Sequence, residues 1–132
     1  MSGFPRRLAA PWVLPVEGPP IAGGAVLVGG DGRIVAVGPD SAVPVPPGVP
    51  AERLPDAVLL PGLINTHTHL ELTGFDGQVP EDDFPAWIRR IIALKAGRTS
   101  AEYLGAARQG LLDGWAAGVT TIADTGDSGA AI

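Results

Sequence analysis

The sequence predicts an α/β fold in which a β-rich first half leads into a strand–helix–strand unit. Short β-branched runs separated by Gly and Pro fill the first half, which is typical of small antiparallel sheets. Two segments with apolar residues at helical spacing follow, and a last apolar strand comes after them. A strand, helical segments and a second strand in this order indicate a βαβ unit with parallel strands.

The composition is that of an ordinary folded chain. Its 132 residues are 45% hydrophobic, which allows one modest core. Nine basic against 14 acidic residues give a net charge of −5, which argues against nucleic acid or an anionic membrane as a partner. No apolar stretch approaches the roughly 20 residues that span a bilayer. The absence of cysteine excludes a disulfide framework, and we expect a cytoplasmic location.

The first half is predicted to form a small sheet. A Gly-rich turn over residues 29–32 separates the β-branched runs 24–28 and 33–37, so we expect a hairpin. Prolines interrupt the extended segment 4–16, which predicts an edge strand. Residues 52–60 are expected to return the chain as one strand into the stretch that follows.

The only two histidines of the chain, His67 and His69, lie one residue apart after an apolar run. Alternate residues of a strand point to the same face, so both imidazoles can face one ion. Neutral imidazole suits zinc and iron. Two histidines at this spacing also occur on half-exposed strands without metal, since two ligands do not complete a site. The preceding apolar strand, its break at Pro61 and Gly62, and the nearby Glu71 favour the metal interpretation.

A polar loop over residues 73–82 is expected to separate the histidine strand from a helix. Asp83 is the predicted N-cap, Pro85 is tolerated in the first turn, and Gly97 ends the apolar periodicity. Trp87 lies at helical spacing among isoleucines, which is more typical of a core position than of a binding site.

Thr99 and Glu102 have the spacing of a capping box, so a second helix is predicted to begin there and to end before Gly118. Its Leu, Ala and Trp residues form one predicted apolar stripe. A strand over residues 119–124 follows. Asp124 at its end is interpreted as a solvated or capping carboxylate.

Residues 61–71, with the sequence PGLINTHTHLE, resemble the first metal-binding strand of the amidohydrolase superfamily of metal-dependent hydrolases. The wording is closest to the deaminase and chlorohydrolase branch and is similar to the aminodeoxyfutalosine-deaminase group. The GVTT sequence at residues 118–121 resembles the second barrel strand of that family. The run 32–38 is similar to a hairpin of the small β-sandwich that precedes the barrel.

The resemblance implies the start of a TIM (β/α)8 barrel, with its first two strands and the intervening helices, preceded by part of a β-sandwich. We expect residues 1–56 to form the sandwich portion and residues 57–132 to form the barrel portion. The fold is incomplete as given, because a whole barrel takes about 250 residues. We therefore expect an amino-terminal fragment.

The same resemblance implies that His67 and His69 bind a divalent metal, zinc or iron. Metal-activated water would then deaminate a small molecule, a purine-nucleoside-like or related C–N substrate. Glu71 and Trp87 are candidate substrate contacts. No catalytic residue is expected within the chain, because the general base and the remaining ligands would lie beyond Ile132. The chain alone is expected to be inactive, and its oligomeric state stays open.

Two other interpretations remain. The chain is a non-catalytic remnant or a β-rich interaction module, which the missing ligands favour. Alternatively, the two histidines bind a metal that is shared across a homo-oligomer. This last arrangement needs special geometry, because closed sites normally take four ligands.

Overall fold

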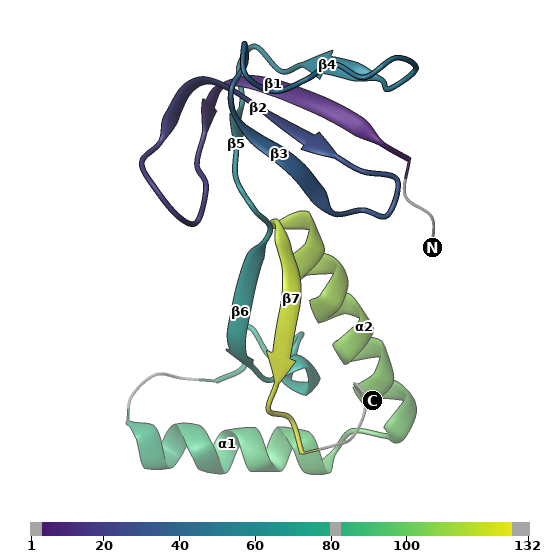
Figure 1. Cartoon of the computed structure of the whole chain (residues 1–132). Helices are drawn as coiled ribbons and strands as arrows, with labels where there is room; N and C mark the ends of the chain where they lie inside the picture. Colours follow the sequence, from purple (N-terminus) through teal and green to yellow (C-terminus); the bar gives the residue numbers. More distant parts are fainter. Residues whose placement is uncertain (1–3, 80–82, 128–132) are drawn as a thin grey trace. The chain divides into compact units, whose positions relative to one another are not determined.

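The computed structural model describes residues 4–79 and 83–127, so the end of the loop expected over residues 73–82 lies outside it. The chain divides into two compact units, Met1–Pro61 and Gly62–Ile132. Within the described residues, the first unit is built from strands, and the second from helices and a pair of parallel strands (Figure 1). Residues 57–61, which we expected to open the second unit, cluster with the first.

The first unit is a five-stranded sheet in the order β3-β2-β1-β4, with β5 also paired to β1 (Figure 1). Its strands are β1 (Arg6–Val13), β2 (Ile21–Val28), β3 (Ile34–Pro39), β4 (Ala51–Arg53) and β5 (Val58–Leu59). The predicted hairpin is confirmed, since β2 and β3 pair antiparallel and Gly32 adopts a positive φ of 79° in their turn. Both β4 and β5 run parallel to β1.

β1 is a central strand, so the prediction of an edge strand broken by proline is wrong. On one side β1 pairs with β2, and on the other β4 pairs with residues 7–9 and β5 with residues 12 and 13. Pro11 lies between these two short partners, where its missing N–H interrupts no registered pair. The single strand expected over residues 52–60 is likewise divided, by a turn at Pro55 and Asp56.

A buried arginine ties the loop after β3 to this sheet. Arg7 is only 4% exposed, and its guanidinium donates to Asp40 Oδ1 at 2.6 Å and to the carbonyl oxygens of Asp40 and Val43. Arg53 donates to the second carboxylate oxygen of Asp40 at 2.5 Å. Hydrogen bonds from Arg7 and then Arg53 hold the pKa of Asp40 below its usual value. The loop thereby covers the small apolar core, formed by Ala9, Ala25, Leu27 and Val43.

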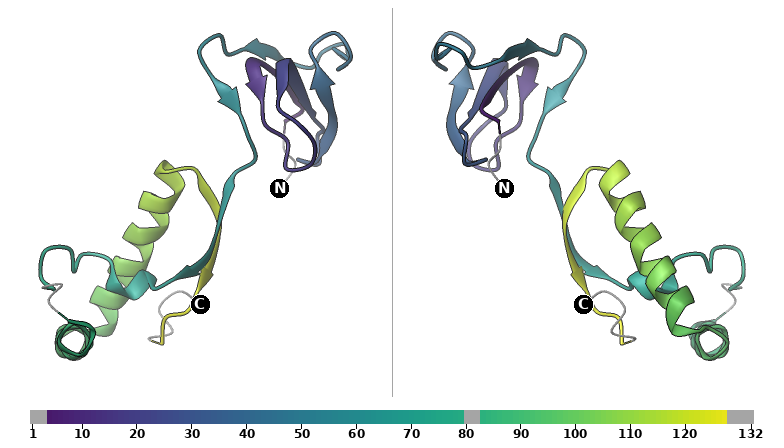
Figure 2. Two further views of the ribbon diagram at one scale, coloured as in Figure 1. Left: turned by 90° about the vertical axis from the view of Figure 1, so that its left-hand side faces the viewer. Right: turned by 90° about the vertical axis from the view of Figure 1, so that its right-hand side faces the viewer.

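The second unit confirms the predicted parallel pairing, between β6 (Leu63–Thr68) and β7 (Val119–Asp124). A short 3-10 helix that we did not predict, η1 (Leu70–Leu72), follows β6 and precedes the loop expected over residues 73–82. Both predicted helices form, α1 (Phe84–Ala96) and α2 (Ser100–Ala116), and α2 runs along one face of the strand pair (Figure 2). In the described part of the chain, neither helix combines the length and the apolarity that crossing a membrane requires.

The predicted helix starts are confirmed by their caps. The Asp83 side chain accepts a hydrogen bond from the Ala86 N–H at 2.7 Å. Thr99 and Glu102 form a reciprocal capping box at the start of α2. Each cap satisfies backbone donors that have no partner inside the helix.

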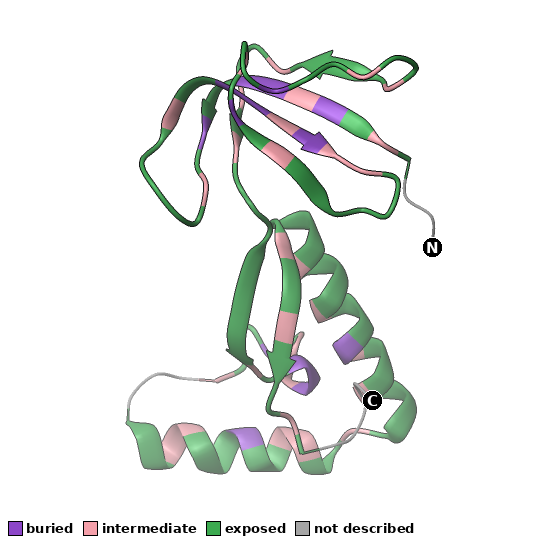
Figure 3. Ribbon diagram, viewed as in Figure 1, coloured by how far each residue is buried: buried purple, intermediate pink, exposed green. Residues whose placement is uncertain are grey.

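The apolar stripe predicted for α2 is mostly exposed (Figure 3). Ala107 is the buried residue of this helix among those described, whereas Trp115 is 70% exposed. Leu63 and Ile64 of β6 are 50% and 66% exposed, although an apolar run predicts a buried strand. The physical reason is that a two-stranded sheet packed by one helix cannot bury both of its faces.

Replacing Asp40 with Asn is expected to lower the unfolding temperature at neutral pH, because the charge that binds Arg7 and Arg53 is lost. Folding lowers the pKa of Asp40 from its usual 3.8, so its contribution is complete above that value. The contribution is lost as the pH falls through the lower pKa of the folded state. Thermal unfolding of wild type and Asp40→Asn should therefore converge at the acid end, and a constant difference would contradict this account.

Candidate metal centre

The two histidines come together at the carboxyl end of β6. His67 lies in the strand and His69 immediately precedes η1. Their ring centroids are 5.2 Å apart, and the ring planes meet at 80°. Two imidazoles that bind one zinc at about 2.0–2.1 Å, with a tetrahedral angle, have centroids about 5 Å apart. The separation of this pair therefore fits a shared ion.

The strand end that carries the histidines is held by its neighbours. The Asn65 side chain accepts a hydrogen bond from the His67 N–H at 3.1 Å. Thr125, just after β7, donates from its hydroxyl to the Thr68 carbonyl at 2.9 Å, and its backbone N–H donates to the same oxygen. The Thr125 hydroxyl oxygen also lies 3.4 Å from His69 Nε2. These contacts fix the backbone on both sides of the imidazoles.

The two histidines by themselves do not complete a metal site. Across residues 4–79 and 83–127, no group of three or more His, Cys, Asp or Glu side chains is placed to hold a metal ion. A structural zinc site takes four ligands, and a catalytic site takes three with an open position. The pair fits a metal as two of these ligands.

Glu71 is buried beside the histidines instead of facing solvent. Its side chain is 2% exposed, and Oε1 lies 3.2 Å from Lys95 Nζ and 3.8 Å from His69 Nδ1. The second oxygen, Oε2, has no hydrogen-bond partner among the described residues. A Cβ at Gly126 would collide with Oε2, so glycine leaves the space that this carboxylate occupies.

Lys95, near the end of α1, is the cation that faces Glu71, and sequence reasoning missed it. Its ammonium donates to both Glu71 and Asp127. The bond to Asp127 raises the pKa of Lys95 most, burial opposes this rise, and Glu71 adds to it. Arg98 donates to the backbone carbonyls of Glu71 and Thr73, and so ties the same segment from the end of the helix. Lys95 is 24 positions from Glu71 and 32 positions from Asp127 in the sequence, so no local sequence pattern indicates these pairs.

Asp124 caps the segment that carries Glu71. Its Oδ1 accepts a hydrogen bond from the Leu70 N–H at 2.9 Å, at the start of η1. The prediction of a capping or solvated carboxylate is confirmed in its capping form. Asp124 thereby connects the end of β7 to the turn directly after His69.

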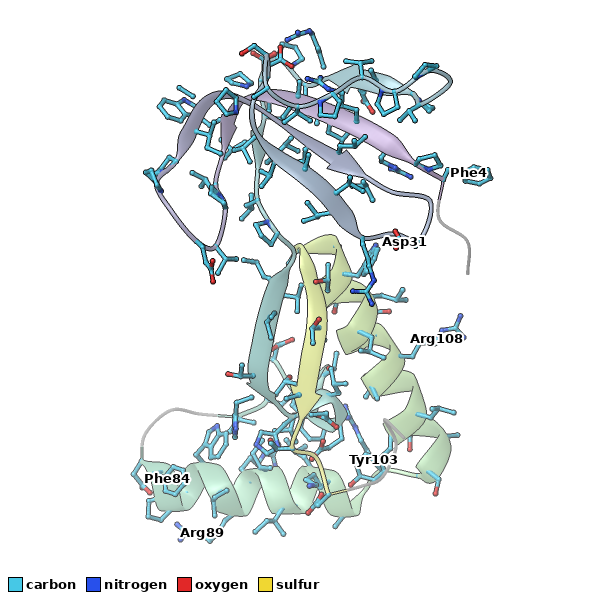
Figure 4. All side chains as sticks on the ribbon, in the orientation of Figure 1. Phe4, Asp31, Phe84, Arg89, Tyr103 and Arg108 are labelled. Atoms are coloured by element: carbon cyan, nitrogen blue, oxygen red, sulfur yellow. The ribbon has the colours of Figure 1, made fainter. Side chains whose placement is uncertain are left out.

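Trp87 lies on α1, where it forms an aromatic pair with Phe84. The two rings stack with centroids 5.7 Å apart and planes 20° apart. Phe84 is 71% exposed at the first turn of the helix (Figure 4), and Trp87 is half-buried. The described residues show no hydrogen bond or ring contact that joins Trp87 to the histidines.

Replacing Lys95 with Met is expected to destabilise the protein by about 1–3 kcal/mol, because a buried carboxylate then loses its partner. Urea unfolding at neutral pH measures this change in the free energy of unfolding. Arg89→Met on the same helix is a matched control, since Arg89 is exposed (Figure 4) and its loss should change stability by no more than about 0.5 kcal/mol. Equal effects of the two variants would contradict a role for Lys95 in neutralising Glu71.

Comparison with known sequences identifies related deaminases. No protein-family model matches the chain. It is 32% identical over 117 residues to a 5-methylthioadenosine/S-adenosylhomocysteine deaminase of Moorella thermoacetica. The match covers 85% of this chain and 26% of the relative, so the chain spans about a quarter of that protein's length.

The fold is similar to solved deaminase structures. An adenosine deaminase from Xanthomonas campestris with bound zinc matches with a TM-score of 0.79 at 24% identity, covering 94% of this chain and 29% of that one. Helicobacter pylori aminofutalosine deaminase, in complex with methylthio-coformycin, matches with a TM-score of 0.73 at 21% identity, covering 90% and 29%. At identities this low, the similarity to these two structures shows a shared fold alone. That fold is mixed α/β, as predicted. By sequence this chain is similar to part of a deaminase, and by fold to part of two solved deaminases, over 26% to 29% of the length of each.

Proposed function

We propose that the chain is the metal-binding amino-terminal portion of a deaminase that acts on a purine-nucleoside-like or related C–N small molecule. The observation that carries the proposal is the His67 and His69 pair, whose ring separation of 5.2 Å fits one shared ion. The pair lies at the carboxyl end of a parallel strand, which is where (β/α)8 enzymes carry their active sites. The relative named a 5-methylthioadenosine/S-adenosylhomocysteine deaminase supports this substrate class.

In this proposal β6 and β7 are the first two strands of a (β/α)8 barrel. The strands of the first unit then belong to a β-sandwich, expected over residues 1–56 and extended here to Pro61 by the pairing of β5 with β1. The parallel pairing of β6 and β7, with helices α1 and α2 between them in the sequence, supports the barrel, because barrels repeat a strand–helix–strand unit. A cytoplasmic location and the absence of nucleic-acid and membrane partners stay predictions.

The residues of this chain would hold and orient the metal. Zinc or iron bound here would supply a hydroxide nucleophile near neutral pH. His67 and His69 would fix the ion at the end of β6, while Asn65 and Thr125 hold the backbone that carries them. The general base and the other ligands are proposed to come from outside this chain, so the chain alone would not catalyse deamination.

Trp87 is the proposed substrate contact on α1. Its stacking with the exposed Phe84 presents an aromatic surface of the kind that planar purine rings contact. The burial of Glu71 argues against the substrate contact that we expected for it. A second interpretation was a β-rich interaction module. The similarity to a named deaminase over 85% of the chain supports the deaminase proposal instead.

The test uses the protein as its gene encodes it, including any sequence beyond residue 132. We expect about one zinc or iron per chain and release of ammonia from 5′-methylthioadenosine, S-adenosylhomocysteine or adenosine. His67→Ala and His69→Ala should each remove the metal and the ammonia release. Metal analysis and an ammonia assay on the same samples measure both.

Thr66→Ala is the matched control, because Thr66 directly precedes His67 and, by the two-residue period of a strand, points to the opposite face of β6. It should keep the metal and the activity. Folded wild-type protein without metal, or with ammonia release that survives the loss of His67, would overturn the proposal.

A further inference from the structure

Glu71 has a position that neither substrate binding nor metal ligation explains. We propose that its Oε1 accepts the proton of His69 Nδ1 and so directs His69 Nε2 toward the ion. Glu71 is then a positioning residue, because it acts through His69 and touches neither metal nor substrate. This role rests on the proposed metal centre and adds a residue to it.

The two nitrogens of His69 have different surroundings. Nδ1 lies 3.8 Å from Glu71 Oε1, which is ion-pair range and about 0.6 Å longer than the upper limit of a hydrogen bond. Nε2 lies 3.4 Å from the Thr125 hydroxyl oxygen, which donates its own proton to the Thr68 carbonyl and so could only accept from a protonated Nε2. This separation is also longer than a hydrogen bond, and a metal ion on Nε2 would displace a proton from that nitrogen. Histidines that bind metal through one nitrogen usually donate the other N–H to a carboxylate or carbonyl oxygen, which fixes the tautomer and the ring plane. Glu71 is the carboxylate placed to accept.

Glu71 is held tightly enough to serve this purpose. Its side chain is 2% exposed, and Lys95 Nζ supplies a positive partner 3.2 Å from Oε1. Arg98 binds its backbone carbonyl, and the backbone of Gly126 packs against Oε2. A carboxylate fixed by cation, backbone and packing defines the plane in which a neighbouring imidazole must lie.

The carboxylate also has unused hydrogen-bonding capacity. Oε2 is buried and has no hydrogen-bond partner within the described residues. Oε1 accepts one hydrogen bond, from Lys95, and a carboxylate oxygen has a second lone pair that can accept the His69 N–H. An anchor for Lys95 alone would not require a histidine next to the carboxylate.

The exposed carboxylate of Asp127 provides the matched control. It binds the same Lys95 ammonium as Glu71, but its side chain is 79% exposed. Asp127→Asn therefore perturbs the anchoring of α1 while it leaves Glu71 beside His69. If only the Glu71 variants change zinc affinity, the change is due to the carboxylate beside His69 and not to a general loosening of α1.

The experiment measures zinc affinity by chelator competition in the full-length protein, for wild type, Glu71→Met, Glu71→Gln and Asp127→Asn. Glu71→Met should weaken zinc binding about 10- to 100-fold, because the orienting acceptor is gone. Glu71→Gln should weaken it less, since the amide oxygen still accepts the Nδ1 proton. Asp127→Asn should stay close to wild type.

A second readout uses the metal-free protein, and its decisive measurement is made on wild type. Nitrogen-15 NMR of the histidine rings should show His69 with its proton on Nδ1, and Glu71→Met should lose that preference. A His69 proton on Nε2 in wild type would overturn the role of Glu71, even if Glu71→Met fails to fold. Unchanged zinc affinity in folded Glu71→Met would also overturn it.

These outcomes separate this role from the proposed function. Wild-type protein that binds zinc and shows the expected tautomer, but releases no ammonia, overturns the deaminase and leaves the role of Glu71 standing. Active protein with unchanged zinc affinity in Glu71→Met overturns the role of Glu71 alone. Wild-type protein without zinc at the histidines overturns both.

Discussion

The parallel pairing of β6 with β7 places the carboxyl ends of both strands at one edge of the sheet. The contacts that Asp124, Thr125 and Gly126 make around the histidine pair follow from this alignment. Thr125 reaches the backbone of β6 because β7 ends beside it, and Asp124 caps the turn after His69 for the same reason. Gly126 follows at once and leaves room for the carboxylate of Glu71. An antiparallel pair would put these groups at opposite ends.

The buried charge of Glu71 adds a second constraint. A carboxylate removed from water needs a partner, and Lys95 reaches it from the far end of α1. The helix is thereby tied to the turn that follows the histidines, and Arg98 adds bonds to the same backbone. This arrangement explains why a charged residue lies on a helix face that is otherwise apolar. The aromatic pair on the first turns of α1 is carried by the same anchored element.

The sequence predicts the features of this protein that depend on local geometry. The two-residue period of a strand predicts that His67 and His69 share a face, and the capping box at Thr99 depends on a three-residue spacing. Parallel strands follow from the strand–helix–strand order. Each of these rules operates within a few residues or between successive elements, so one sequence is sufficient to apply it.

The features that the sequence does not predict depend on distant residues. Lys95 has a helical spacing that suits an apolar face, and its partner Glu71 is 24 positions away. Pro11 alone indicates an edge strand. The structure shows that one short strand, β4, pairs with β1 before Pro11 and another, β5, pairs with it after Pro11. Apolar periodicity predicts that Trp115 is buried, but Trp115 is 70% exposed. Periodicity identifies an apolar face and does not identify the element that covers it. The histidines and Glu71 therefore indicated the candidate site from the sequence, whereas the cation Lys95 that faces Glu71 was missed.

Anomalous diffraction at the zinc edge, from crystals of the full-length protein grown with zinc, tests the central claim most directly. The claim is that His67 and His69 bind one shared ion. The account predicts a single anomalous peak about 2.0–2.1 Å from a ring nitrogen of both histidines. A peak bound at other residues, with both imidazoles free of metal, would contradict it.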